Sequence, residues 1–224
     1  MSTVSSSRPV ILVIHGTWHH PGFYAPLCQA LDKLGYESVC PHLPTCYKDV
    51  PPTKTVNDDA ALIRKTAKNL LDNGKHVLAV MHSYGGCAFI LQGGNSLAGT
   101  FGGRLPPFIE TDDQKNTLKV PDPITWFFND VPSMDTAAWP KELVVHPKHA
   151  QFDPTKHEAY RTIPATYIVY EKDVAFIPQM QEMMIDRARK AGVNIAIERL
   201  PASHSPFLSM PEETAKLVVK IALQ

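Results

Sequence analysis

The sequence has no long apolar run and no net charge, and each absence removes a class of protein. No stretch approaches the roughly 18 apolar residues needed to cross a bilayer, and the polar start MSTVSSSRP lacks the apolar centre of a secretion signal. Basic and acidic residues each number 22, so no excess charge favours nucleic acid or an anionic membrane. We therefore expect a cytoplasmic protein with no nucleic-acid or membrane partner.

Cysteines and metal-ligand patterns are also scarce. None of the 4 cysteines shows a C-x-x-C spacing, which favours small buried residues or free thiols in a reducing compartment. The HPKH stretch at 146–149 has two histidines but no third ligand nearby in the sequence. We expect neither a metal ion nor a cofactor.

What is present indicates one α/β domain over 8–224. Strands are expected where apolar runs occur and helices where apolar residues recur at helical spacing. This alternation predicts a mostly parallel sheet with helices on both faces. Many of the 20 prolines fall between 106 and 164, so we expect an irregular lid over 105–160, inserted within the domain. The strands are expected at 10–14, 37–40, 76–81, 165–170 and 193–200, and the helices at 25–34, 55–72, 178–191 and 211–224.

Three polar loops follow three of these strands. Ser83 lies in HSYGG after VLAVM, Asp173 in EKD after TYIVY, and His204 in PASHSPF after IAIERL. Such loops meet at the carboxyl edge of a parallel sheet, where reactive residues gather. Alone, each residue suits a turn, a helix cap or an ordinary loop. Together, in the order Ser, Asp, His, they predict a catalytic triad.

The chemistry explains these residue types. A serine hydroxyl attacks only when an imidazole takes its proton, and the imidazole needs a carboxylate to fix its tautomer. The negative oxygen of the tetrahedral intermediate needs backbone N–H donors. The N–H groups of Tyr84, just after the serine, and Thr17, in HGTW after the first strand, are the predicted donors.

The chain resembles the α/β-hydrolase superfamily, in the branch that holds plant methylesterases, hydroxynitrile lyases and small fungal hydrolases. By this resemblance Ser83 is the nucleophile, His204 the base and Asp173 the acid, with Thr17 and Tyr84 as oxyanion donors. The resemblance covers most of the chain outside the lid. Its matching stretches are VILVIHGTWH, GYESVCPHLPT, VLAVMHSYGG, FFND, IPATYIVYEKDVAFIPQMQ and ASHSPFLSMPEE.

Two positions separate esterases from lyases within that branch. The lyases carry a threonine after the first histidine and a lysine after the catalytic one, whereas this chain has Gly16 and Ser205. Without a cation to stabilise departing cyanide, the lyase interpretation weakens.

The chain departs from the family pattern in two places. Met81 occupies the first glycine position of the G-x-S-x-G elbow. After HSYGG, roughly two dozen residues are missing, about the length of one helix and one strand. We therefore expect a sheet with one strand fewer on the far side of VLAVM, unless residues 86–105 form a three-turn helix and a central strand.

Aromatic residues suggest the substrate class. Trp18, His82, Trp126, Phe128 and Phe207 are the candidate substrate contacts, in an apolar pocket with few polar anchors. The sequence thus predicts a serine hydrolase, monomeric or dimeric, that cleaves small esters, lactones or thioesters through an acyl-enzyme. The alternatives are a lyase, decarboxylase or cyclase that uses the same histidine as base, and a non-catalytic ligand-binding relative.

Overall fold

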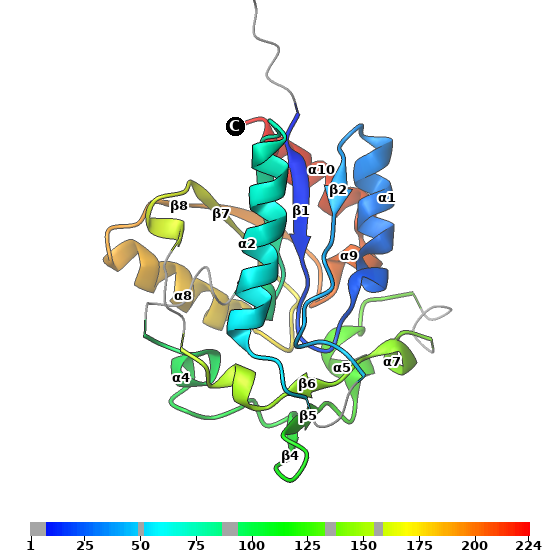
Figure 1. The fold of residues 1–224 in the computed structure, drawn as a ribbon, viewed down its shortest axis with the longest axis vertical. Coiled ribbons are helices and arrows are strands. Elements are labelled where there is room, and N and C mark those ends of the chain that lie inside the picture. Colours follow the sequence, from blue (N-terminus) through cyan, green and yellow to red (C-terminus); the bar gives the residue numbers. More distant parts are fainter. Residues whose placement is uncertain (1–7, 49–51, 87–93, 133–137, 155–158) are drawn as a thin grey trace, which may run out of the picture.

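A three-stranded parallel sheet forms the centre of the fold. The computed structural model describes residues 8–48, 52–86, 94–132, 138–154 and 159–224. β1 (Val10–Ile14) pairs in parallel with β2 (Ser38–Val39) on one side and with β3 (Val77–Met81) on the other. The strand order is β2-β1-β3, and β1 and β2 lie next to each other in Figure 1. The five apolar residues of β1 are buried, as expected for a central strand.

Helices cover both faces of this sheet, which confirms the expected architecture. Alternate side chains of a strand point to opposite faces. Ile11 and Val13 accordingly pack in one core cluster with residues of α1 (Ala25–Lys33) and α10 (Pro211–Ala222). Leu12 and Ile14 pack in a second cluster, against Val56, Ile63 and Ala67 of α2 (Val56–Asp72).

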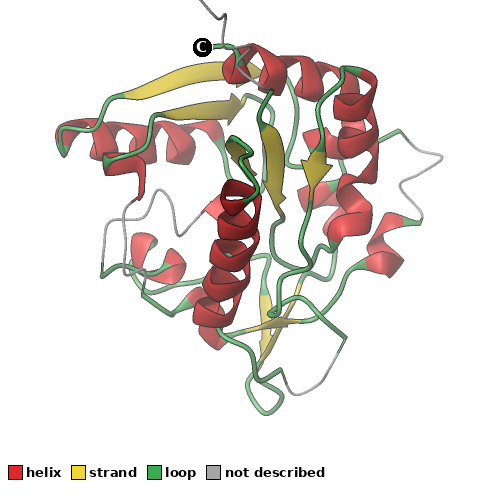
Figure 2. Cartoon of the chain, turned by 45° about the horizontal axis from the view of Figure 1, so that its top comes forward, coloured by secondary structure: helices red, strands yellow, loops and turns green. Residues whose placement is uncertain are grey.

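A second sheet is separate from the first. β7 (Ala165–Tyr170) pairs in parallel with β8 (Ile195–Leu200), and α8 (Pro178–Lys190) connects them. Figure 2 shows this pair set apart from the strands of the central sheet. In the described part of the chain, no strand joins β3 to β7.

The expected shortening of the sheet concerns the chain after the loop that holds Ser83. Within 94–105 the structure has one short helix, α4 (Leu97–Thr100), and no strand. Residues 87–93, on which this expectation also depends, lie outside the described residues. Ala79, in the middle of β3, is exposed, which is unusual for a strand flanked on both sides in a parallel sheet.

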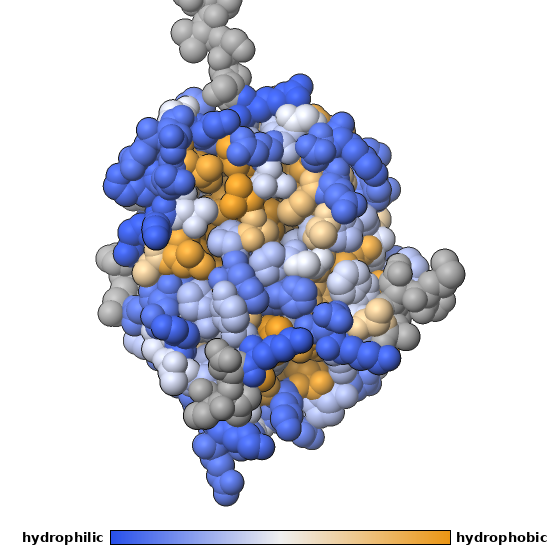
Figure 3. Space-filling model, turned by 45° about the vertical axis from the view of Figure 1, so that its right-hand side comes forward, coloured by the Kyte–Doolittle hydropathy of each residue, from blue (hydrophilic) through white to orange (hydrophobic). Residues whose placement is uncertain are grey.

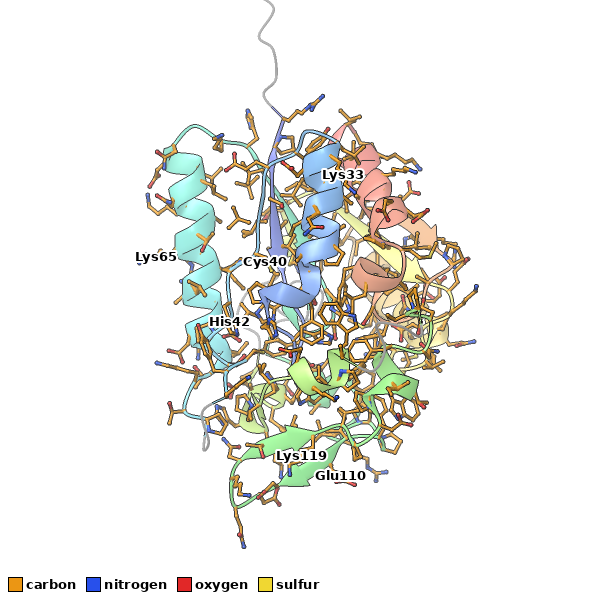
Figure 4. All side chains as sticks on the ribbon, turned by 90° about the vertical axis from the view of Figure 1, so that its right-hand side faces the viewer. Lys33, Cys40, His42, Lys65, Glu110 and Lys119 are labelled. Carbon is orange, nitrogen blue, oxygen red and sulfur yellow. The ribbon has the colours of Figure 1, made fainter. Side chains whose placement is uncertain are left out.

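The described residues of the segment 105–160 lie beyond the carboxyl end of β1 (Figure 1). The prediction of an irregular segment was wrong in one respect, because three short strands form a small antiparallel sheet there. Its strands are β4 (Glu110–Asp112), β5 (Thr117–Lys119) and β6 (His146–Pro147). Glu110 pairs across from Lys119 at the end of the molecule in Figure 4, where their opposite charges suit cross-strand neighbours.

Short helical turns complete the fold. Two of them, η1 and α9, lie next to long helices, and the others lie in or beside the segment 105–160. They are η1 (Pro21–Tyr24), α5 (Pro123–Phe127), α7 (Trp139–Glu142), η2 (His149–Gln151), η3 (Ala159–Arg161) and α9 (Pro206–Ser209).

The visible surface is mostly polar. Figure 3 shows hydrophilic side chains over most of one face, with hydrophobic areas between them. Among the described residues, no helix has both the length and the apolar character to cross a bilayer.

Candidate active site

The carboxyl ends of four strands meet at one cavity of about 1000 Å³. Thr17 follows β1, Ser83 follows β3, Asp173 follows β7 and His204 follows β8, and all four line it. The structure therefore brings together the residues that the sequence places in three separate triad loops and one oxyanion loop.

Ser83 occupies a sharp turn between a strand and a helical turn. Its φ of 53° lies in the left-handed region that residues with a side chain rarely adopt. Residues 84–86 are already helical. A Cβ at Gly85 would lie 2.6 Å from the carbonyl oxygen of Ile14, so the turn can pack against β1 only with glycine there. Met81 in place of the family's glycine is compatible with this turn.

His204 and Asp173 form a buried pair. Nδ1 of His204 lies 2.8 Å from Oδ2 of Asp173, and the side chains are 9% and 2% exposed. Oδ1 of Asp173 accepts the N–H groups of Ala175 and Phe176, each at 2.9 Å. A carboxylate oxygen only accepts, so Nδ1 of His204 carries the proton and, in the neutral ring, Nε2 keeps its lone pair.

The loop after β1 approaches the serine closely. A Cβ at Gly16 would lie 2.9 Å from Nδ1 of His82 and 3.1 Å from Cβ of Ser83, so glycine allows the contact. The N–H of Thr17 takes part in none of the hydrogen bonds found among the described residues. Tyr84 is the first residue of its helical turn, so its N–H has no partner within that turn.

A buried carboxylate that the sequence did not reveal holds the side chain of Tyr84. Asp59 of α2 is 2% exposed and accepts the Tyr84 hydroxyl at 2.8 Å. It also accepts the Thr45 hydroxyl at 2.7 Å and the Thr45 N–H at 2.9 Å. Burial raises the pKa of Asp59 from 3.8 to about 6, although these hydrogen bonds oppose the shift.

The raised pKa of Asp59 predicts a pH-dependent stability difference. An acid whose pKa is raised in the folded state stabilises that state while it is protonated. This stabilisation is complete below about pH 4 and is lost as pH rises through about 6. Asp59→Asn removes the titration. We therefore expect the stability of Asp59→Asn relative to wild type to improve by roughly 3 kcal/mol between about pH 4 and about pH 7, as measured by urea unfolding.

The neighbouring Asp58 is the control for this measurement. It lies at the surface, and its pKa is lowered by hydrogen bonds from Thr55. Asp58→Asn should therefore lose stability relative to wild type as pH rises, which is the opposite of the change expected for Asp59→Asn. If the free energies of unfolding of wild type and Asp59→Asn changed with pH in parallel, the raised pKa of Asp59 would be contradicted.

A second carboxylate, which is half-buried, connects the segment 105–160 to the histidine loop. Asp130, in the FFND stretch, accepts the N–H of Ser203 at 2.7 Å and the hydroxyl of Ser209 at 3.1 Å. Sequence reasoning noted FFND as a match without assigning it a role. Since Ser203 immediately precedes His204, Asp130 helps to fix where the histidine lies.

The five aromatic and histidine residues predicted to contact substrate divide into two groups. Trp18 and His82 line the cavity. Trp126, Phe128 and Phe207 are not among the lining residues; Trp126 stacks on Phe108, while Phe128 and Phe207 are 0% and 2% exposed in the core. Their contact with substrate stays a prediction.

The cavity continues from Ser83, Asp173 and His204 into the space between β3 and β7. Its lining includes every residue of β3 and residues 165–168 and 170 of β7. Helices α2 and α10 contribute the apolar side chains of Ile63, Ala67 and Val218. A strand between β3 and β7 would occupy this space, and none of the described residues forms one.

The fold and the site together define a hydrolase of the α/β type. The sequence matches the model of the alpha/beta hydrolase family over residues 11–217. The chain therefore belongs to the alpha/beta hydrolase family.

Curated fungal relatives are hydrolases of similar sequence. "Probable hydrolase R7" of Phoma sp. is 27% identical, and the match covers 96% of this chain and 99% of that protein. "Alpha/beta hydrolase nvfD" of Aspergillus novofumigatus is 25% identical, with 94% and 95% covered. The alignment with R7 spans 249 positions, more than the 224 residues of this chain, so R7 has residues without a counterpart here.

Solved structures share the fold. A pyrethroid hydrolase from Sphingobium faniae has a TM-score of 0.76 at 21% identity, with 96% of this chain and 97% of that chain covered. The methylesterase MES16 from Arabidopsis has a TM-score of 0.71 at 17% identity, with 96% and 99% covered. The fold therefore extends over nearly the whole length of both.

Proposed function

We propose that the protein is a serine esterase that cleaves small carboxylic esters, lactones or thioesters of apolar or aromatic character. The observation that carries this proposal is the buried hydrogen bond of 2.8 Å between His204 and Asp173 at a cavity that Ser83 also lines. The turn that holds Ser83, with its φ of 53°, gives independent support because strain of this kind gathers at reactive residues.

The proposed reaction has two steps. Oγ of Ser83 bonds to the ester carbonyl carbon while its proton passes to Nε2 of His204. The carbon–oxygen ester bond then breaks, and the leaving alcohol takes that proton. In the second step His204 takes a proton from water, the water oxygen bonds to the acyl carbon, and Oγ leaves with the proton restored.

Asp173 and the two N–H groups have supporting roles in both steps. Asp173 keeps the proton of His204 on Nδ1 and stabilises the imidazolium that forms. The N–H groups of Thr17 and Tyr84 stabilise the oxyanion of each tetrahedral intermediate. Removal of one such donor typically costs about 3–4 kcal/mol.

The cavity lining supports an apolar substrate. Away from the catalytic residues the lining is mostly aliphatic and aromatic, with Leu105, Phe108, Ile109 and Phe127 from the segment 105–160. Arg104 is the one lysine or arginine among the described lining residues. A substrate with several negative charges would find little compensation there.

Mass spectrometry of the intact protein tests the mechanism. A fluorophosphonate should add one phosphonyl group at Ser83, as the serine oxygen bonds to phosphorus and fluoride leaves. Rapidly quenched p-nitrophenyl butyrate should give the corresponding butyryl adduct at the same residue. A lyase, decarboxylase or cyclase would turn over its substrate without an acyl adduct, and a binding protein would show neither adduct.

A further inference from the structure

Three loops of the active site are joined by buried hydrogen bonds that involve none of the proposed triad side chains. The N–H of Gly16 donates to the Tyr24 hydroxyl at 3.0 Å. That hydroxyl lies 2.7 Å from Nδ1 of His82, and Nε2 of His82 lies 2.9 Å from the carbonyl oxygen of His204. Gly16 belongs to the oxyanion loop, His82 precedes the nucleophile, and His204 is the proposed base.

The direction of each of these hydrogen bonds follows from the groups involved. A carbonyl oxygen only accepts, so Nε2 of His82 donates to His204. Burial lowers the pKa of His82 well below its usual range, so the ring is neutral and Nδ1 accepts. The Tyr24 hydroxyl must therefore donate to Nδ1, and it accepts from Gly16. Each donor and acceptor in the series thus has a partner.

Packing holds Tyr24 and His82 in place. The Tyr24 ring is 1% exposed and stacks on Phe207 with ring centres 4.1 Å apart. His82 is 4% exposed, and its ring lies edge-on to that of His204 at 4.9 Å. Neither ring can turn to a new partner without displacing the aromatic side chains around it.

The oxyanion loop is also fixed on its other side. Nδ1 of His15 lies 3.0 Å from the Gly16 carbonyl, and Nε2 of His15 accepts the Leu43 N–H at 2.9 Å. Since Nε2 accepts, Nδ1 of the neutral ring donates. In a trans peptide the C=O and the N–H point in opposite directions. Fixing the Gly16 carbonyl therefore fixes the direction of the Thr17 N–H, the proposed oxyanion donor.

We propose that the Tyr24–His82 bridge, formed by the Gly16 N–H, Tyr24, His82 and the His204 carbonyl, is a positioning device for catalysis. It sets the oxyanion loop, the nucleophile turn and the histidine loop at fixed distances from one another. Tyr24 and His82 are positioning residues, because they act through Thr17, Ser83 and His204. This inference rests on the proposed serine mechanism and goes beyond its triad.

Tyr24→Phe tests the bridge directly. It keeps the ring but removes the hydroxyl, which frees Gly16 and leaves Nδ1 of His82 without its donor. We expect the rate of Ser83 phosphonylation and the kcat for p-nitrophenyl butyrate to fall about 10- to 100-fold, with KM changed less than about twofold. A trifluoromethyl ketone, which forms a tetrahedral adduct, should bind more weakly by a similar factor.

Tyr36→Phe is the matched control. Tyr36 is 3% exposed and belongs to the same core cluster as Tyr24, and Arg8 lies over its ring. Among the described residues, Tyr36 makes a backbone hydrogen bond to Leu31 and a ring contact with Arg8, and none of these reaches the loops of Thr17, Ser83 or His204. We expect Tyr36→Phe to keep the phosphonylation rate of wild type, which would show that removing the hydroxyl of a buried tyrosine does not by itself explain the effect.

Two substitutions of His82 separate the two sides of the bridge. His82→Asn keeps an acceptor near the position of Nδ1 but loses the donor to the His204 carbonyl. His82→Gln keeps a donor near Nε2 but loses the acceptor for Tyr24. In the His82→Gln background, Tyr24→Phe should therefore cause less than about a threefold further loss of phosphonylation rate.

The outcomes distinguish this proposal from the proposed function. If wild type forms the Ser83 adduct and Tyr24→Phe forms it equally fast, the positioning role is wrong although the serine mechanism stands. A lower Tm with unchanged kinetics would also refute the proposal. Absence of an adduct in the folded wild-type protein would instead refute the serine mechanism.

Discussion

Replacing Ser83 by alanine should reduce hydrolysis of p-nitrophenyl butyrate by ~10³-fold or more, because no other group in the proposed mechanism can form the acyl-enzyme. The fold should survive, since alanine keeps the Cβ of serine at this turn. Circular dichroism and the Tm should match wild type within a few degrees. Residual activity should equal that left by the oxyanion donors and substrate binding alone.

Ser205→Ala is the matched control for Ser83. Ser205 is buried and adjacent to His204, and its hydroxyl has no hydrogen-bond partner in the described structure. Its removal should leave the rate within about twofold of wild type, as for substitutions that break no interaction. Equal loss in both variants, or no loss in Ser83→Ala, would exclude Ser83 as the nucleophile.

Asp173→Asn should lower kcat by ~10³- to 10⁴-fold, because it changes the tautomer of His204. The N–H groups of Ala175 and Phe176 both point at Oδ1, which holds the amide oxygen of the new asparagine in that position. Its NH₂ group then faces Nδ1 of His204, which must accept. The His204 proton moves to Nε2, and the imidazole can no longer take the serine proton.

Glu171→Gln controls for charge removal from the same loop. Glu171 lies two residues before Asp173 and is exposed. It should change kcat less than about twofold, since surface substitutions away from such contacts have small effects. NMR of the His204 ring should show the proton on Nδ1 in this control and on Nε2 in Asp173→Asn. An unchanged tautomer with lost activity would contradict the explanation.

The regular elements could be predicted from local patterns. β1 is five consecutive apolar residues, and it forms a strand buried on both faces. α2 carries Val56, Ile63 and Ala67 at helical spacing, and these residues pack against the sheet. Such patterns suffice because the apolar residues on the buried face of a strand or helix recur at the spacing characteristic of that element.

The small sheet formed by β4, β5 and β6 was missed because its pattern is weak. Its strands are two or three residues long, and one ends at Pro147. Local propensity predicts no strand in runs this short. Contacts made by Trp18 help to hold the sheet: its indole donates to the Leu118 carbonyl at 3.0 Å, and its own carbonyl accepts from Val144 at 2.8 Å.

Part of the candidate site also followed from the sequence. Ser83, Asp173 and His204 each follow a predicted parallel strand, and parallel strands carry their carboxyl ends to one edge. Their common cavity is a consequence of that topology. The aromatic residues were less predictable, because an aromatic side chain in a loop can line a cavity or fill the core, as Phe128 does.

The sequence by itself determined the strand and helix pattern, the family and the order of the three proposed triad residues, since each depends on neighbouring residues in the chain. Only the tertiary structure decided which buried polar groups meet. Tyr24 and His82 are 58 residues apart, and Asp59 lies 25 residues before Tyr84. Such contacts have no local signature, because they form only when packing removes water and leaves buried polar groups to pair with one another.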